Sequence, residues 1–300
     1  MKTVNVLMST YNGEKYIREQ IESVLNQYEV QVILTVRDDG STDDTINILK
    51  EYERRGKLTW TSGENLRTAK SFMELVDKAD DFDFYAFCDQ DDIWLPEKLI
   101  KAVSTLEKRD NKLPMLYCSD YQLVDSKLNP ISGPKHTTAT AYSAAIIACS
   151  ATGCTVVFNR ALRDLLKEYK PKYQGMHDSW AGRVCLAVGG IVLFDAEYKS
   201  ILYRQHGGNV LGGVKSSRLK RLSSLVCKIK HKECVVSRQA QELLNGYGKY
   251  MSADNLRITE LVADYKQSPL KRMRLLFSRK ISPGRGLILG AKLGVLFGFL

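Results

Sequence analysis

The stretch FDFYAFCDQDDIWLP, residues 82–96, carries the pattern that decides the fold. Its apolar half, residues 82–87, is typical of a buried strand and stops at the acidic loop 88–92. Pro96 then opens a helix, where its missing N–H costs nothing. The same order of apolar run, polar loop and amphipathic helix occurs three times upstream, with strands at 4–8, 32–36 and 58–60 and helices at 17–25, 46–52 and 72–79. This alternation predicts a parallel sheet covered by helices on both faces.

The pattern becomes mixed after about residue 115. We predict strands near 116–124, 155–158, 191–194 and 198–203, and helices near 161–168 and 178–188. From residue 216 onward the chain has helical patterning with basic faces. We therefore expect an α/β fold with a mostly parallel sheet in residues 1–214, and a helical, basic extension in residues 215–300.

Charge is distributed unevenly along the chain, whose net charge is +10. Residues 215–300 hold 18 Lys and Arg against 5 Asp and Glu, which leaves 26 basic and 29 acidic residues in the first 214. The main body is therefore not a nucleic-acid-binding domain. The basic tail, with Lys271, Arg272 and Arg274 beside the apolar run 287–300, favours a peripheral contact with an anionic membrane surface, and a packed helical region or an oligomer interface is the alternative.

The cysteines and the apolar segments indicate in which cellular compartment the protein is expected. The seven cysteines include no C-x-x-C pair, and Cys88, Cys118, Cys154 and Cys185 lie in apolar runs, which indicates reduced, buried thiols in a cytoplasmic protein. The first ten residues alternate like a strand and do not resemble a secretory signal. The run 287–300 is shorter than the roughly 20 residues that a membrane span needs.

Acidic loops follow two of the predicted strands. Asp38 and Asp39 end the second strand, where ligands bind in open α/β sheets, and a carboxylate there can accept the imide N–H of uracil or thymine. Asp89 and Asp91 end the strand at 82–87. Alternate residues of an extended segment point the same way, so these two carboxylates can converge on Mg²⁺ or Mn²⁺ and leave positions open for phosphate.

Two further segments carry polar side chains suited to catalysis. Asp178 stands at a predicted helix start, where it can cap the helix and can also take a proton from an attacking hydroxyl. The segment 203–209, YRQHGGN, contains Arg204 and His206, which can engage phosphate or metal or can belong to a surface loop. A dinucleotide-binding dehydrogenase is excluded, because residues 9–14 read STYNGE and lack the G-x-G-x-x-G loop.

These segments together resemble the inverting glycosyltransferases of family 2, which have the GT-A fold. The resemblance is strongest to bacterial rhamnosyltransferases of polysaccharide assembly. It rests on the stretches STYNG (9–13), DDGSTD (38–43), DQDDIW (89–94), GCT (153–155), HD (177–178) and YRQH (203–206). Their order and spacing match that family over about the first 210 residues, and jointly they are far more specific than any one of them. Arg37 departs from the pattern, because a small residue is expected before Asp38.

The resemblance implies a role for each matched residue. Nucleotide-sugar binding is implied for Thr10, Tyr11, Asn12, Asp38, Asp39, Asp89, Gln90 and Arg204. Asp91 would be the main ligand of Mn²⁺ or Mg²⁺, with His206 beside it. Asp178 would be the general base, and His177 and Trp180 would contact the acceptor.

The resemblance also implies substrates and partners. The expected donor is dTDP-β-L-rhamnose, and the expected acceptor is a polyprenyl-diphosphate-linked or other glycan of the cell surface. Two alternatives stay open: a UDP-hexose donor on the same fold, and a scaffold that binds nucleotide sugar without catalysis. The sequence also leaves open whether the chain forms a homo-oligomer.

Overall fold

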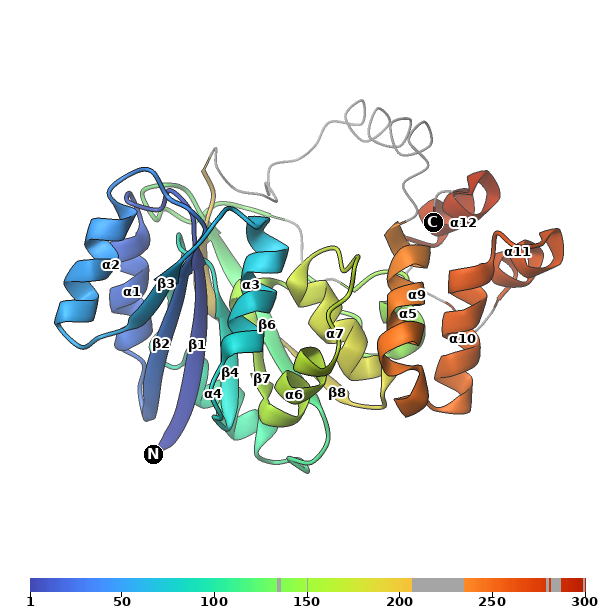
Figure 1. Ribbon diagram of the computed structural model, residues 1–300, viewed down its shortest axis with the longest axis horizontal. Helices are drawn as coiled ribbons and strands as arrows, with labels where there is room; N and C mark the ends of the chain where they lie inside the picture. Colours follow the sequence, from blue (N-terminus) through green and yellow to red (C-terminus); the bar gives the residue numbers. More distant parts are fainter. Residues whose placement is uncertain (134–135, 150, 207–234, 279–280, 282–286, 299) are drawn as a thin grey trace.

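The computed structural model describes residues 1–133, 136–149, 151–206, 235–278, 281, 287–298 and 300 (Figure 1). Within that part, eight strands form one sheet in the order β3-β2-β1-β4-β7-β6-β8-β5. The strands are β1 (Lys2–Thr10), β2 (Val30–Asp38), β3 (Thr59–Ser62), β4 (Phe84–Cys88), β5 (Ile93–Trp94), β6 (Met115–Val124), β7 (Val157–Asn159) and β8 (Ile191–Arg204).

The sheet is mixed. Strands β3, β2, β1 and β4 run parallel, as the strand–helix alternation predicts. Strand β7 is antiparallel to both β4 and β6, β8 returns parallel to β6, and β5 pairs antiparallel with β8. In register, Thr10 lies opposite Asp38, and Met8 lies opposite Cys88. The polar loops that follow β1, β2 and β4 therefore emerge at one edge of the sheet.

One strand differs from its prediction. We expect two strands, 191–194 and 198–203, but β8 is continuous. The pairing with β6 shifts between Ser119, opposite Asp195, and Asp120, opposite Lys199. A local irregularity in the pairing therefore absorbs the interruption of the apolar pattern without ending the strand.

Helices cover both faces of the sheet. Alternate residues of β1 define the faces: Val4, Val6 and Met8 pack in one hydrophobic cluster and Leu7 in the other. The first cluster contains residues of α1 (Ile17–Leu25), α2 (Thr45–Arg54) and α4 (Lys98–Leu106). The second contains residues of α3 (Arg67–Lys78), α6 (Arg160–Glu168), α7 (His177–Ala187) and the short α5 (Tyr142–Ala145). The structure therefore has the predicted arrangement, a sheet covered by helices on both faces.

The C-terminal region is helical, as predicted, and shares this second core. It comprises α9 (Val235–Tyr247), α10 (Ala253–Asp264), α11 (Pro269–Leu276) and α12 (Leu287–Phe297). Leu243 and Tyr247 of α9 belong to the same cluster as Trp180 of α7. The boundary that we predict between residues 214 and 215 lies outside the described residues. No helix in the described part of the chain is both long and apolar enough to cross a membrane.

Candidate active site

A cavity of about 520 Å³ lies at the carboxyl edge of β1, β2 and β4. Its wall comes from the ends of these strands, from α3, from the start of α7 and from the end of β8. It is lined by Ser9, Thr10, Tyr11, Asp39, Thr68, Phe72, Asp89, Gln90, Asp91, His136, Cys149, Ala151, Thr152, Gly153, Met176, His177, Asp178, Ser179 and Tyr203. Eight of the predicted site residues therefore meet in one cavity, although they come from distant parts of the sequence.

The two carboxylates after β2 have different surroundings. Asp38 is buried and does not line the cavity. It accepts hydrogen bonds from the N–H groups of Gly40 and Ser41 and from the Ser62 hydroxyl. Gly40 has a φ of 85°, which favours glycine, so Asp38 closes a tight turn. Asp39, in contrast, lines the cavity.

Arg37 anchors Asp39, which explains the unexpected residue before the acidic pair. Its buried guanidinium forms an ion pair with the Asp39 carboxylate and lies 3.3 Å from a carboxylate oxygen of Glu74 on α3. It also donates to the Ser71 hydroxyl, at 3.2 Å, and to the Glu64 carbonyl, at 3.1 Å. The Asp39 carboxylate accepts the N–H groups at positions 66 and 67 as well. Arg37 thus joins the end of β2 to the loop and helix beside the cavity.

Replacing Arg37 by Ala should weaken the binding of dTDP and UDP by at least about tenfold, because the buried Asp39 carboxylate loses its cation and the adjoining loop loses its anchor. The free energy of unfolding should also fall by about 3 kcal/mol. Isothermal titration with each nucleotide in the presence of Mn²⁺, below the melting temperature of the variant, measures the effect. Arg54→Ala, on the exposed side of α2, is the matched control. Unchanged affinity in Arg37→Ala would contradict an anchoring role.

Gln90 fixes the loop that follows β1. Its side-chain oxygen accepts from the Thr10 hydroxyl at 2.5 Å and from the Tyr11 N–H at 2.8 Å, and its amide group donates to the Tyr11 carbonyl at 3.0 Å. Asn12 has a φ of 48° and accepts from the Thr42 N–H at 2.8 Å. Gln90 therefore joins the loops after β1 and β4, whereas Asn12 joins those after β1 and β2 and does not line the cavity.

The acidic loop after β4 presents Asp89 and Asp91 to the cavity. One carboxylate oxygen of Asp91 lies 2.8 Å from Nε2 of His206, so the two predicted metal ligands are neighbours. Burial, together with the negative charges of Asp91 and Asp178, raises the pKa of Asp89 to about 8. Among the residues that the structure describes, the Asp89 carboxylate has no hydrogen-bond partner.

This donor set fits a hard divalent cation. Two cavity-lining carboxylates and an imidazole are ligands that Mn²⁺ accepts and that leave room for phosphate oxygens. A cation would also supply the partner that the Asp89 carboxylate lacks and would offset the repulsion between Asp89 and Asp91. Asp89 and Asp91 would therefore hold the metal, with His206 next to them.

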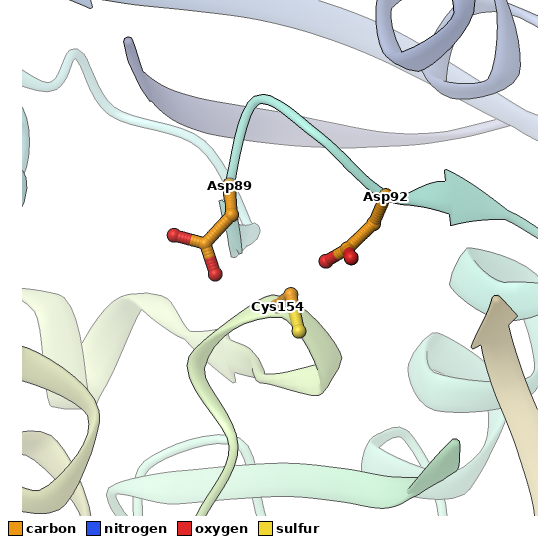
Figure 2. Close-up of side chains that lie close together, drawn as sticks. All are labelled: Asp89, Asp92 and Cys154. Carbon is orange, nitrogen blue, oxygen red and sulfur yellow. The ribbon is translucent and has the colours of Figure 1, made fainter. Parts of the chain in front are cut away.

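A second group near this loop is less suited to a metal. Figure 2 shows Asp89, Asp92 and Cys154, whose ligand atoms lie within 4.8 Å of one another. Asp92 is fully buried, lies outside the cavity wall and accepts the backbone N–H of Arg204 at 3.0 Å. Burial raises the pKa of the Cys154 thiol well above its usual value, so this sulfur stays protonated and is a poor ligand for Mg²⁺ or Mn²⁺.

Arg204 lies behind the acidic loop and does not line the cavity, contrary to the expectation that it meets the donor. Its side chain is 3% exposed and pairs with Glu19 on α1 at 2.5 Å. It also donates to the carbonyl of Asp91 at 2.9 Å and to the carbonyl of Ser126 at 3.0 Å. The guanidinium therefore fixes the backbone of Asp91, and its charge is already compensated within the protein.

Asp178 stands in the first turn of α7 and faces the cavity. Its carboxylate accepts the N–H of Gly153 at 2.9 Å and the N–H of Ser179 at 2.6 Å. Burial raises the pKa of Asp178 to about 6, although these hydrogen bonds favour the charged form. A Cβ atom on residue 153 would lie 2.8 Å from Nε2 of His177 and 3.4 Å from the Asp178 carboxylate. The glycine at 153 therefore lets the backbone approach His177 and Asp178 closely.

The two residues predicted to contact the acceptor lie in apolar surroundings. His177 lines the cavity, stacks on Phe72 with ring centroids 3.9 Å apart, and meets Phe87 edge-on at 4.7 Å. Burial lowers the pKa of His177 to about 3, so its ring is neutral. Trp180 is fully buried in the core, near Tyr247 of α9, and does not line the cavity. It packs α7 on the C-terminal helices, so the expected acceptor contact is corrected to a structural one.

Sequence reasoning missed part of the cavity wall. His136 lines the cavity, is bonded at Nε2 to the Thr138 and Thr152 hydroxyls, and lies against Tyr121. The residue type could have indicated it, since each histidine that the structure describes lies at or beside the cavity. The apolar members Phe72, Cys149 and Met176 carry no signal that separates them from ordinary core residues.

Comparison with known proteins identifies the family. The model of Glycosyl transferase family 2 matches residues 5–166, more than half of the chain, so this chain belongs to that family. The dTDP-rhamnosyl transferase RfbG of Shigella flexneri is 36% identical over 109 residues, which cover 33% of this chain and 36% of that protein. The UDP-Glc:alpha-D-GlcNAc-diphosphoundecaprenol beta-1,3-glucosyltransferase WfgD of Escherichia coli is 32% identical over 164 residues, or 53% of this chain and 61% of that protein.

A solved structure shows the same fold. The crystal structure of Staphylococcus aureus TarS in complex with UDP-GlcNAc matches with a TM-score of 0.57 at 19% identity, over 100% of this chain and 78% of that chain. The GT-A fold predicted from the sequence is confirmed. The resemblance to family 2 and to its rhamnosyltransferases is confirmed as well. These two curated relatives are matched over 36% and 61% of their own length.

Proposed function

We propose that this chain is a metal-dependent glycosyltransferase that transfers L-rhamnose from dTDP-β-L-rhamnose, with inversion, to a glycan acceptor of cell-surface polysaccharide synthesis. One observation carries the enzymatic part: a single cavity holds the loop of Asp39, the carboxylates of Asp89 and Asp91, and the carboxylate of Asp178. Such a transfer needs a site for the nucleotide base, a site for the diphosphate, and a side chain that accepts a proton.

The mechanism follows from these positions. Thr10, Tyr11 and Asp39 would hold the nucleoside at the ends of β1 and β2. A divalent cation at Asp89 and Asp91, when bound, would neutralise the charge of the leaving diphosphate. Asp178 would take the proton from the acceptor hydroxyl as its oxygen forms a bond to the anomeric carbon and the bond to the diphosphate breaks. Displacement from one side would invert the anomeric centre, so a β-linked donor would give an α-linked product.

Two observations favour rhamnose as the transferred sugar. The chain is similar to a dTDP-rhamnosyl transferase. In addition, the ring of Phe72 lines the cavity beside Asp178 and stacks on His177, whose ring is neutral. If the transferred sugar lies against these rings, the methyl group of a 6-deoxy sugar would pack on them more favourably than the hydroxymethyl group of a hexose.

The second candidate donor is a UDP-hexose, which the likeness to WfgD favours. The name of WfgD also includes a diphosphoundecaprenol-linked acceptor, and this supports a polyprenyl-diphosphate-linked glycan as the acceptor of this chain. Because such a lipid lies in a membrane, we place the enzyme in the cytoplasm at the inner face of the cell membrane.

A donor panel tests this proposal. The purified chain with Mn²⁺ receives dTDP-L-rhamnose, UDP-glucose or UDP-GlcNAc together with a lipid extract that contains polyprenyl-diphosphate-linked glycans, and nucleotide release is measured with and without extract. We expect acceptor-dependent release of dTDP to exceed release of UDP by at least about tenfold, which is the discrimination that one apolar contact can supply. Faster consumption of a UDP-hexose would show that the donor is a UDP-hexose and not dTDP-L-rhamnose. The protein would still be a glycosyltransferase. Binding of every donor without release would favour a scaffold.

A further inference from the structure

Helix α11 exposes an apolar face. Leu270, Met273 and Phe277 follow the i, i+3, i+7 spacing that puts residues on one side of a helix, and they are 62%, 49% and 69% exposed. Leu275, on the opposite side, is buried in the core. The helix is held in place by that contact, by Pro269 in its first turn and by Ser268, whose hydroxyl accepts the N–H of residue 271. The exposed face is therefore already formed in the folded chain.

This surface is unusual for the molecule. Nine large apolar side chains are exposed within the described ranges, and four of them, Leu270, Met273, Phe277 and Leu296, lie on α11 and α12 or directly after α11. Figure 1 places these two helices at the opposite end of the long axis from α1 and α2. Apolar side chains that gather in this way mark an interaction surface, whereas isolated ones need no explanation.

Positive charge lies on one flank of the same face. Residues 265–278 contain four basic residues and no acidic one. Lys271 is paired with Asp264 at 3.1 Å. Arg274 is exposed, lies about one turn after Leu270 along one flank of the apolar row, and forms no ion pair with any described residue. An apolar row with a basic side chain on its flank complements a surface that has both hydrocarbon and negative charge.

We propose that the α11 face formed by Leu270, Met273, Arg274 and Phe277 docks the protein on an anionic membrane. A membrane is favoured as the binding partner of this face by this charge complementarity and by the membrane location, which rests on the proposed function. The three apolar side chains enter the boundary between headgroups and acyl chains, and Arg274 stays at the level of the lipid phosphates. An 8-residue helix binds weakly and reversibly by itself, which suits a peripheral enzyme.

Flotation with vesicles tests the docking face without using turnover. The full chain is mixed with vesicles of equal parts phosphatidylglycerol and phosphatidylcholine, or of phosphatidylcholine alone. We expect the wild type to float with the anionic vesicles only. The triple variant Leu270→Gln, Met273→Gln, Phe277→Gln should lower the partition coefficient at least about tenfold. Arg274→Gln should lower it about fivefold on anionic vesicles.

Matched variants on other surfaces serve as controls. Tyr28→Gln combined with Leu113→Gln removes exposed apolar side chains elsewhere, and Lys57→Gln removes an exposed charge after α2. Both should float like the wild type. The proposal is wrong if the triple variant also floats like the wild type, if the wild type does not float, or if the triple change only turns a dimer into a monomer in sedimentation velocity. The donor panel, run on the wild type without these vesicles, can fail independently of this result.

Discussion

Replacing Asp178 by Asn should lower kcat by roughly 10²- to 10⁴-fold and leave nucleotide affinity close to that of the wild type. An amide cannot take the proton of the acceptor hydroxyl. It can still accept one of the two backbone N–H groups, of Gly153 or Ser179, that the carboxylate accepts. The transfer rate, measured beside dTDP affinity and melting temperature, checks this expectation.

The pH dependence gives a second readout of the same group. Burial raises the pKa of Asp178 to about 6. A general base acts only when it is deprotonated, so kcat of the wild type should rise as the pH increases through about 6 and should level off above it. This rise should be absent from the residual activity of Asp178→Asn. His177, whose pKa is lowered to about 3, should not contribute to the profile in this range.

Asp44→Asn is the matched control, because Asp44 precedes α2 and does not line the cavity. That variant should keep normal turnover. Near-normal turnover in Asp178→Asn would remove this residue from the mechanism. A loss of nucleotide binding or a lowered melting temperature, together with lost turnover, would instead assign Asp178 a structural role at the start of α7.

Chelation of divalent cations should abolish transfer, and added Mn²⁺ or Mg²⁺ should restore it. Asp91→Ala should reduce turnover at least about a hundredfold in the presence of either metal, because the charge of the leaving diphosphate is then not compensated. The affinity for Mn²⁺ alone, followed by its electron spin resonance signal, should fall as well. That measurement does not depend on donor or acceptor.

Asp83→Ala is the control for Asp91→Ala, because Asp83 directly precedes β4 at the opposite end from the acidic loop. It should bind Mn²⁺ and turn over normally. Full activity in EDTA would contradict metal dependence and would shift the charge compensation to basic side chains. Normal Mn²⁺ affinity in Asp91→Ala would instead point to Asp89 as the main ligand.

Much of the fold could be predicted because it depends on local patterns. The apolar runs at 4–8 and 84–87 are buried strands, since parallel strands covered on both faces are apolar throughout, and the run 32–36 lies in strand β2 with Leu34 and Val36 buried. The antiparallel insertion of β7 between β4 and β6 could not be predicted. Pairing direction depends on long-range contacts, which a stretch of 3 residues does not encode by itself.

The candidate site, like the fold, could be predicted only in part. The sequence could indicate Asp39, Asp89, Asp91 and Asp178, because each stands where a strand ends or a helix begins. It could not show that Asp39 lines the cavity whereas Asp38 does not. It also could not show that Arg204 lies behind the acidic loop and outside the cavity wall. Burial and partners decide those differences, and they follow from how the elements pack.

The sequence by itself determined the class of protein. Its spaced polar motifs at the ends of apolar strands are local and jointly specific, and the family match confirms what they indicate. Tertiary structure alone decided the roles within the site: Arg37 became the anchor of Asp39, Gln90 a clamp between two loops, and Trp180 a core residue. The physical reason is that a side chain's chemistry depends on its neighbours, its desolvation and its hydrogen-bond partners, and the neighbours that matter here lie far away in the sequence.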